Sequence, residues 1–492
     1  MDPFLRKECL PDTRTNVLEF IINWVNDLRT TQNVLWIYGL AGSGKSTLST
    51  TIANRFRESG NLGTFIFFDR DIAERNNPRD VIRTMAYQLG VFHPDIGEII
   101  ASALKSSPNI CLSPISYQFQ KLFLDTLSPS KGFTVSAPIV LVLDALDECG
   151  TPKDREILLT VLSDKSRDLH PNIRFIFTSR AEIDILRAFN HQIHVRTLEL
   201  DITVRDNHCD IQLYIRHRMA NICRRMILSL GDDWPGEKMI EELTEQASGL
   251  FIWASTAMEF IDGYDPRRRL ASLLSAKVAT TAQATLDALY LRALNLVGIW
   301  DDEDFVSDFR SILGLVLVAQ RPLSSEGIDR LLCRSQDRPS IPVIKHLGCV
   351  MRASPTVRFL HPSFAEFLLT PARCNNDAWF FDRAIYHHIA AKKCLQHLDA
   401  VLKRNICNLT LSADMADESL PDHTSYACMF WVHHLCVIGD VQMSLVDELD
   451  KFLRQHLIHW FESMSILKRS RDTIPLLGRL LDWLVSSVDV LT

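Results

Sequence analysis

Apolar residues change their spacing along the chain, and the first 200 residues alternate between two patterns. Short continuous apolar runs, rich in β-branched and aromatic residues, are typical of strands buried on both faces of a parallel sheet. Between these runs, apolar residues recur at helical spacing. The predicted strands are 34–38, 63–68, 139–143, 174–177 and 192–195, and the predicted helices include 81–89 and 115–127. The alternation therefore predicts an α/β domain over residues 33–200, with a parallel sheet flanked by helices.

Strand patterns nearly vanish after residue 200, and helical spacing dominates. The segments that predict a helical domain over residues 201–300 are 211–219, 239–247, 251–261 and 286–296. A winged-helix domain over residues 301–372 is predicted from helical segments, a short strand and a final helix, at 312–319, 324–332, 357–360 and after His361. Residues 373–492 remain helical, with expected core anchors at Trp379, Trp431, Trp460 and Trp483. Residues 1–32 are predicted to be a helical lead-in.

The most specific motif is a glycine-rich loop between the first predicted strand and the next helix. It matches glycine, any four residues, glycine, lysine, then serine or threonine, and consists of Gly39, Leu40, Ala41, Gly42, Ser43, Gly44, Lys45 and Ser46, followed by Thr47. Glycines let backbone N–H groups surround phosphate oxygens, and the helix N-terminus adds partial positive charge. Lys45 is expected to reach the outer phosphates, and the Ser46 hydroxyl to ligate magnesium. The motif predicts a P-loop nucleotide-binding site.

Acidic residues follow the third predicted strand. Asp144 stands at its carboxyl end, where ligands of open α/β sheets bind, and is expected to hold magnesium through water. Asp147 or Glu148 would orient or deprotonate the attacking water, and Asp147 is the first choice. The fourth predicted strand leads to Arg180, whose planar guanidinium suits a contact with the terminal phosphate. The alternative is that Arg180 is a surface residue that caps the strand.

These motifs together resemble a NACHT domain, the nucleotide switch of signal-transducing ATPases (STAND NTPases) that include NLR-like sensors. The resemblance rests on the glycine-rich loop, the acidic box 143–148 and the segment 177–180. Segments 9–14 and 249–254 resemble a fungal, nephrocystin-like subgroup. Residues 357–368 resemble the winged-helix signature of these switches.

The resemblance implies binding of ATP/ADP with Mg²⁺, slow ATP hydrolysis that resets a signal-transduction switch, and self-association in the ATP state. A protein effector or ligand is implied without being identified. The lead-in would pack near the adenine or serve only as a covering helix. His361 would contact the phosphate of bound diphosphate; the alternative is a helix-start histidine satisfied by its own backbone. Many relatives carry an effector and repeats, which this sequence does not show, so it is a minimal member, a truncated gene model or a fragment.

Composition narrows the function classes. A net charge of −7 and a pI of about 6.2 argue against nucleic-acid binding through bulk charge, and basic residues do not cluster on 324–332. The 12 cysteines form no Cys-x-x-Cys pair, which favours reduced thiols and a cytoplasmic location. Histidine pairs at 387–388 and 433–434 could suggest zinc, but neighbouring helical residues point in different directions. No signal peptide is visible, and the run 312–319 is far shorter than the roughly 20 residues of a membrane span.

Two rival classes use the same loop. One is a phosphoryl-transfer kinase or a motor-type P-loop ATPase. A small-molecule kinase typically has an arginine-rich lid and a compact chain, whereas more than half of these 492 residues fall in predicted helical domains. The other is a scaffold with a degenerate site, against which the intact Lys45, Ser46 and Asp144 argue. A nucleotide switch with weak NTPase activity is therefore the preferred interpretation.

Overall fold

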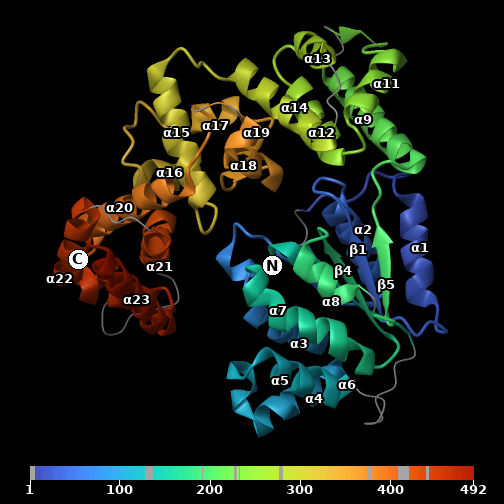
Figure 1. Cartoon of the computed structure of the whole chain (residues 1–492), viewed down its shortest axis with the longest axis horizontal. Helices are drawn as coiled ribbons and strands as arrows, with labels where there is room; N and C mark the ends of the chain where they lie inside the picture. Colours follow the sequence, from blue (N-terminus) through green and yellow to red (C-terminus); the bar gives the residue numbers. More distant parts are fainter. Residues whose placement is uncertain are drawn as a thin grey trace. The chain divides into compact units, whose positions relative to one another are not determined.

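The computed structural model describes residues 6–127, 137–190, 192–226, 230–231, 233–275, 281–374, 376, 378–407, 420–438 and 443–491. The chain divides into two compact units, residues 1–286 and 287–492 (Figure 1). A loop that the sequence predicts at 129–138 lies mostly outside the described residues.

A five-stranded parallel sheet forms the centre of the first unit, as the alternating pattern predicts. Its strands are β1 (Val34–Tyr38), β2 (Leu62–Phe67), β3 (Ile139–Asp144), β4 (Ile173–Ser179) and β5 (Val195–Glu199). Their order is β2-β3-β4-β1-β5, and every pairing is parallel. β4 therefore lies between β1, which precedes the glycine-rich loop, and β3, which precedes the acidic turn that carries Asp147 and Glu148. The carboxyl ends of these three strands meet at one edge of the sheet.

The sequence pattern predicts the position of the last strand wrongly. The predicted strand 192–195 ends where β5 begins, because β5 runs from Val195 to Glu199. β5 is an edge strand, and Arg196, Thr197 and Glu199 are exposed. An edge strand with polar residues on its outer positions lacks the continuous apolar run that identifies a buried strand.

Helices cover both faces of the sheet (Figure 1). On one face, α1 (Thr15–Asn26) and α2 (Lys45–Glu58) pack on alternate strand residues such as Leu35 and Ile37. The helices that share the core of the other face are α3 (Pro78–Phe92), α4 (Pro94–Ser106), α5 (Ile115–Phe119), α6 (Asp125–Leu127), α7 (Pro152–Thr160) and α8 (Ile183–Phe189). Because successive strand residues face opposite sides, each buried strand supplies both cores.

The rest of the first unit is helical, as expected. Its helices are α9 (Arg205–Arg225), α11 (Glu237–Gln246), α12 (Phe251–Ile261) and α13 (Pro266–Leu274). α14 (Ala282–Val297) crosses the boundary between the units. The segment predicted at 251–261 matches α12 residue for residue.

The second unit begins with the elements of the predicted winged helix. They are α15 (Glu303–Val318), α16 (Ser325–Leu331), α17 (Ile341–His346), the antiparallel pair β6 (Met351–Arg352) and β7 (Arg358–Phe359), α18 (Pro362–Leu368) and α19 (Pro371–Cys374). The later helices are α20 (Arg383–Val401), α21 (Asp422–Cys436), α22 (Met443–Ile466) and α23 (Thr473–Leu491). All four predicted tryptophan anchors are buried. The five-part division into domains stays a prediction. None of the described helices is long and apolar enough to cross a membrane.

Candidate nucleotide-binding site

The glycine-rich loop joins β1 to α2 at the carboxyl edge of the sheet. Gly42 and Gly44 have φ angles of 79° and 93°, a left-handed conformation that favours glycine. Gly44 is the residue before α2, and Lys45 is the first residue of the helix. The loop therefore combines left-handed glycines with the N-terminus of α2, and a helix N-terminus that follows a glycine-rich loop is suited to bind phosphate.

Lys45 folds back over this loop. Its Nζ donates hydrogen bonds to the carbonyl oxygens of Gly39, at 2.8 Å, and Leu40, at 2.7 Å. Burial lowers the pKa of Lys45 to about 8, an effect that the nearby Asp147 carboxylate partly opposes. Two carbonyl oxygens thus hold the ammonium beside the loop that it would serve.

Contacts from distant segments support the loop. A Cβ atom on Gly42 would lie 2.0 Å from Cγ2 of Ile252, whose N–H donates to the Gly42 carbonyl oxygen at 3.1 Å. Arg14 Nη2 donates to the Ser43 carbonyl oxygen at 2.8 Å and to Asn207 Oδ1 at 2.7 Å. None of these three supporting side chains was expected from the sequence to make such contacts. Arg14 lies in the predicted lead-in and Ile252 in the segment 249–254, whereas no sequence signal marked Asn207.

Asp144 ends β3 and is fully buried. The Thr178 hydroxyl, from the neighbouring β4, donates to Asp144 Oδ1 and accepts the Ala145 N–H at 3.0 Å. The other carboxylate oxygen, Oδ2, lies 2.8 Å from Nη2 of Arg6. Neither contact was expected from the sequence, because nothing in the local pattern of Thr178 or Arg6 signals a partner in β3.

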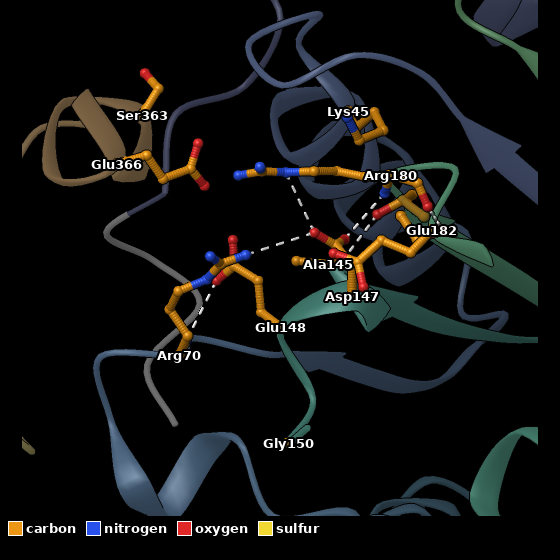
Figure 2. Close-up of polar contacts among 12 residues, drawn as sticks. Lys45, Arg70, Ala145, Asp147, Glu148, Gly150, Arg180, Glu182, Ser363 and Glu366 are labelled. Atoms are coloured by element: carbon orange, nitrogen blue, oxygen red, sulfur yellow. Dashed lines mark hydrogen bonds and ion pairs between the residues drawn. The ribbon is translucent and has the colours of Figure 1, made fainter. Parts of the chain in front are cut away.

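Asp147 is held by arginines from two strand ends (Figure 2). The backbone N–H of Arg180 donates to Asp147 Oδ1 at 3.0 Å, and the guanidinium Nε of Arg180 lies 3.4 Å from Asp147 Oδ2. Arg70, which follows β2, places Nη2 3.8 Å from the same Oδ2. Asp147 and Arg180 therefore lie together, as their predicted places after two strands of the parallel sheet led us to expect. Arg70 is an addition that the sequence pattern did not indicate.

Glu148 has a different environment from Asp147. Its side chain is partly accessible at the surface, yet it is closely surrounded by protein atoms, and this burial raises its pKa to about 7. The Glu148 Oε2 atom accepts a hydrogen bond from the backbone N–H of Arg70 at 3.3 Å. A carboxyl with a pKa near neutrality can accept a proton from water more readily than one with an ordinary pKa.

A buried arginine fixes the acidic turn to α8. Arg155, which is 1% exposed, donates from Nη1 to the Asp147 carbonyl oxygen at 2.8 Å. Its guanidinium also forms ion pairs with Glu182 and with Asp184. The turn that carries Asp147 and Glu148 is thus held through its backbone, and the two side-chain carboxylates do not take part in this contact.

His361 belongs to the second unit and precedes α18. Its Nδ1 accepts the Ser363 N–H at 3.1 Å and lies 2.7 Å from the Ser363 hydroxyl, which is itself 2.7 Å from the Tyr290 hydroxyl. His361 therefore caps a helix. Its contact with a nucleotide stays a prediction.

The donor set suits magnesium rather than a metal held by protein alone. Within the described residues, no group of three or more His, Cys, Asp or Glu side chains could hold a metal ion. Mg²⁺ is usually bound through one or two carboxylates together with waters and substrate phosphates. One buried carboxylate, Asp144, at the end of β3, together with the Ser46 hydroxyl at the start of α2, fits this pattern.

Comparison with known proteins gives two kinds of match. A solved structure of Cdc6p from Pyrobaculum aerophilum matches with 10% identity and a TM-score of 0.34, covering 73% of this chain and 94% of that one. A structure of Drosophila ORC bound to DNA matches with 11% identity and a TM-score of 0.30, covering 68% and 80%. TM-scores of this size carry no argument about function.

The sequence matches are more specific. A family model described as Nephrocystin 3, N-terminal, matches residues 17–180, from α1 to Arg180. The vegetative incompatibility protein HET-E-1 of Podospora anserina is 25% identical over 475 residues, which are 89% of this chain and 33% of the relative. The chain thus spans about a third of the length of this curated relative. This chain is therefore similar to the Nephrocystin 3, N-terminal, family over residues 17–180 and to HET-E-1 over most of its own length, which agrees with the nephrocystin-like resemblance of the sequence motifs.

Proposed function

We propose that this chain is a nucleotide-operated signalling switch that binds ATP/ADP with Mg²⁺ and hydrolyses ATP slowly. The P-loop NTPase-like fold and the NACHT relative support a nucleotide-dependent NTPase. The observation that carries the proposal is the meeting of Lys45, Asp144 and Arg180 at the carboxyl ends of three adjacent strands. Ligands of open α/β sheets bind at this edge.

Each group has a role that follows from its position. The loop N–H groups and Lys45 would hold the phosphates. Magnesium, when bound, neutralises charge on the outer phosphates; Ser46 and Asp144 are the side chains that would hold it, the latter through water. Arg180, already fixed by Asp147, would place its guanidinium beside the terminal phosphate.

The geometry favours Glu148 over Asp147 for activating water. Both oxygens of Asp147 are engaged, one by a backbone N–H and the other by two arginines. The Asp147 carboxylate is therefore already used to hold Arg180 and Arg70. Glu148 has a raised pKa, as a general base near neutral pH requires. Asp147 would then position Arg180 and Arg70.

In the proposed cycle, diphosphate holds the closed state through His361 on the winged helix. Triphosphate favours an open state that self-associates in the cytoplasm and transmits a signal to a protein partner. A nucleotide can shift such an equilibrium only through different affinities for the two states. His361 would supply this difference, because it would contact the nucleotide in the closed state alone.

The first prediction tests nucleotide binding itself. Ligand at a hundred times its dissociation constant stabilises a protein by about 2.7 kcal/mol. Thermal melts with ATP or ADP and Mg²⁺ should therefore show a clear upward shift for the unmodified protein. Lys45→Ala should lose most of this shift, because it removes the charge at the loop. Lys105→Ala, at an exposed position on α4, is the matched control. A full shift in Lys45→Ala would contradict the assignment of the loop.

A further inference from the structure

The segment before α1 is tied to the nucleotide site. The Cys9 N–H donates to Thr51 Oγ1 at 2.8 Å, and Asn54 Nδ2 donates to Glu8 Oε1 at 2.7 Å. Thr51 and Asn54 both lie on α2, the helix that follows the glycine-rich loop. At the other end of the segment, Arg14 holds the loop itself. Residues 6–14, here termed the amino-terminal strap, are thus anchored at both the loop and the helix.

The first residue of this strap, Arg6, reaches the acidic strand end. Its guanidinium carbon lies 4.4 Å from the ring centroid of Phe67, the last residue of β2. In the sheet register, Phe67 is the neighbour of Asp144. Arg6 Nη2 lies 2.8 Å from Asp144 Oδ2. A fully buried carboxylate needs a counter-charge, since its desolvation is otherwise costly, and Arg6 supplies that charge.

This pair is close but incompletely bonded. Although Arg6 Nη2 and Asp144 Oδ2 are within ion-pair distance, their angles are not those of a hydrogen bond. Arg6 Nη1 and Asp144 Oδ2 are both buried and have no hydrogen-bond partner in the described part of the chain. Asp144 Oδ1, in contrast, is satisfied by Thr178. Asp144 Oδ2, which can still accept a hydrogen bond, is therefore the oxygen that lies against Arg6.

We propose that Arg6 is a built-in counter-ion that competes with hydrated magnesium for Asp144. The inference rests on the proposed nucleotide function. One carboxylate oxygen cannot accept from a guanidinium and from a metal-bound water in the same place, and the two cations repel each other. Binding of magnesium-nucleotide must displace Arg6, whereas binding of metal-free nucleotide leaves the pair intact. The strap thereby sets how strongly nucleotide affinity depends on magnesium.

The test compares nucleotide affinity with magnesium and with EDTA in Arg6→Gln. An adjacent arginine typically changes the affinity of a carboxylate for a proton by about ten- to a thousandfold, and we expect a comparable factor for hydrated magnesium. Arg6→Gln should raise the ratio of ATP affinity with magnesium to that without magnesium by this factor, as measured by calorimetric titration. Lys7→Gln, at the exposed neighbouring position, should keep the unmodified ratio. Arg6→Lys, which retains the charge, should also stay close to it.

Three outcomes would overturn the inference. The ratio could be the same in Arg6→Gln and in the unmodified protein. Arg6→Gln could bind magnesium-ATP more weakly, which would make Arg6 a phosphate ligand. The effect of Arg6→Gln could persist in an Asp144→Asn background, which would place its action elsewhere.

Failure of the inference can be told apart from failure of the proposed function. If ATP binding depends on Lys45 but the magnesium ratio does not depend on Arg6, the function stands and the competition is wrong. If the unmodified protein binds no nucleotide, both are wrong. A thermal melt of each variant without nucleotide shows whether it folds.

Discussion

At the scale of single residues, the site separates two neighbouring carboxylates by environment. Asp147 is surrounded by a backbone N–H and two guanidinium groups, whereas Glu148 meets one backbone N–H in a poorly solvated position. Sequence spacing placed both residues correctly after a buried strand, but it could not separate their roles. The separation comes from Arg180, which follows β4 and pairs with Asp147, and from the burial of Glu148, whereas Arg70, which follows β2, acts on both carboxylates.

The second prediction follows from this separation. If Glu148 is the base, single-turnover hydrolysis should rise with pH through about 7, because Glu148 accepts a proton only when it is ionised. Glu148→Gln should spare ATP binding and slow hydrolysis by about a hundredfold or more, with this pH dependence lost. Asp147→Asn should instead lower stability by about 1–3 kcal/mol, because it leaves the arginines partly unpaired. Normal hydrolysis in Glu148→Gln, with slow hydrolysis and a normal melt in Asp147→Asn, would return the water-directing role to Asp147.

At the scale of elements, the sequence predicts best where structure is locally determined. β1, the glycine-rich loop and α2 follow one another within 25 residues, and strand, turn and helix signals agree there. The edge strand β5 was misplaced, because its outer positions are polar. The supporting contacts of Arg6, Arg14 and Arg155 could not be predicted, since each partner belongs to an element that only the tertiary fold brings near.

Two later helices are joined by a buried histidine pair. His387 on α20 and His434 on α21 have Nδ1 atoms 2.9 Å apart, and His434 Nε2 lies 2.8 Å from the Tyr426 hydroxyl. Burial lowers the pKa of His387 to about 4 and that of His434 well below its usual value. The charge of Arg383 opposes protonation of His387 further, and so does His433 when it is protonated, although burial lowers the pKa of His433 itself to about 4. Both rings are therefore neutral in the folded state at pH 7.

The third prediction is a loss of stability in mild acid. Below about pH 6.5 these histidines are protonated in the unfolded chain but stay neutral in the folded protein. The free energy of unfolding therefore falls as the pH drops toward 4. At pH 5, His387 alone should account for about 2 kcal/mol, since each unit of pKa shift is about 1.4 kcal/mol. Thermal melts between pH 7 and 5 measure this. His387→Gln should weaken the pH dependence, and His217→Gln, at an exposed position, should leave it unchanged. Equal pH dependence in both variants would show that the acid sensitivity arises elsewhere.

At the scale of the whole molecule, each compact unit carries part of the proposed switch. Residues 1–286 hold the glycine-rich loop and the acidic turn, and residues 287–492 hold His361. The structure also shows that His361 caps α18, so a simple alanine variant changes two things at once. Loss of an N-cap costs about 0.5–2 kcal/mol in helix stability, whatever the nucleotide does. A test of the switch must therefore separate the cap from the contact with diphosphate.

The fourth prediction makes this separation with two variants of His361. His361→Ala removes both the cap and the imidazole, whereas His361→Asn keeps a side-chain oxygen that can cap the helix. If the imidazole holds diphosphate, its loss removes a hydrogen bond to a charged group, worth about 1.5–3 kcal/mol. Both variants should then release ADP about ten- to a hundredfold faster and show more self-association with ATP, as measured by nucleotide exchange and light scattering. If His361 acts only as a cap, His361→Asn should behave as the unmodified protein does and His361→Ala should merely melt earlier. That second result would leave the P-loop site in place and remove the diphosphate latch from this chain.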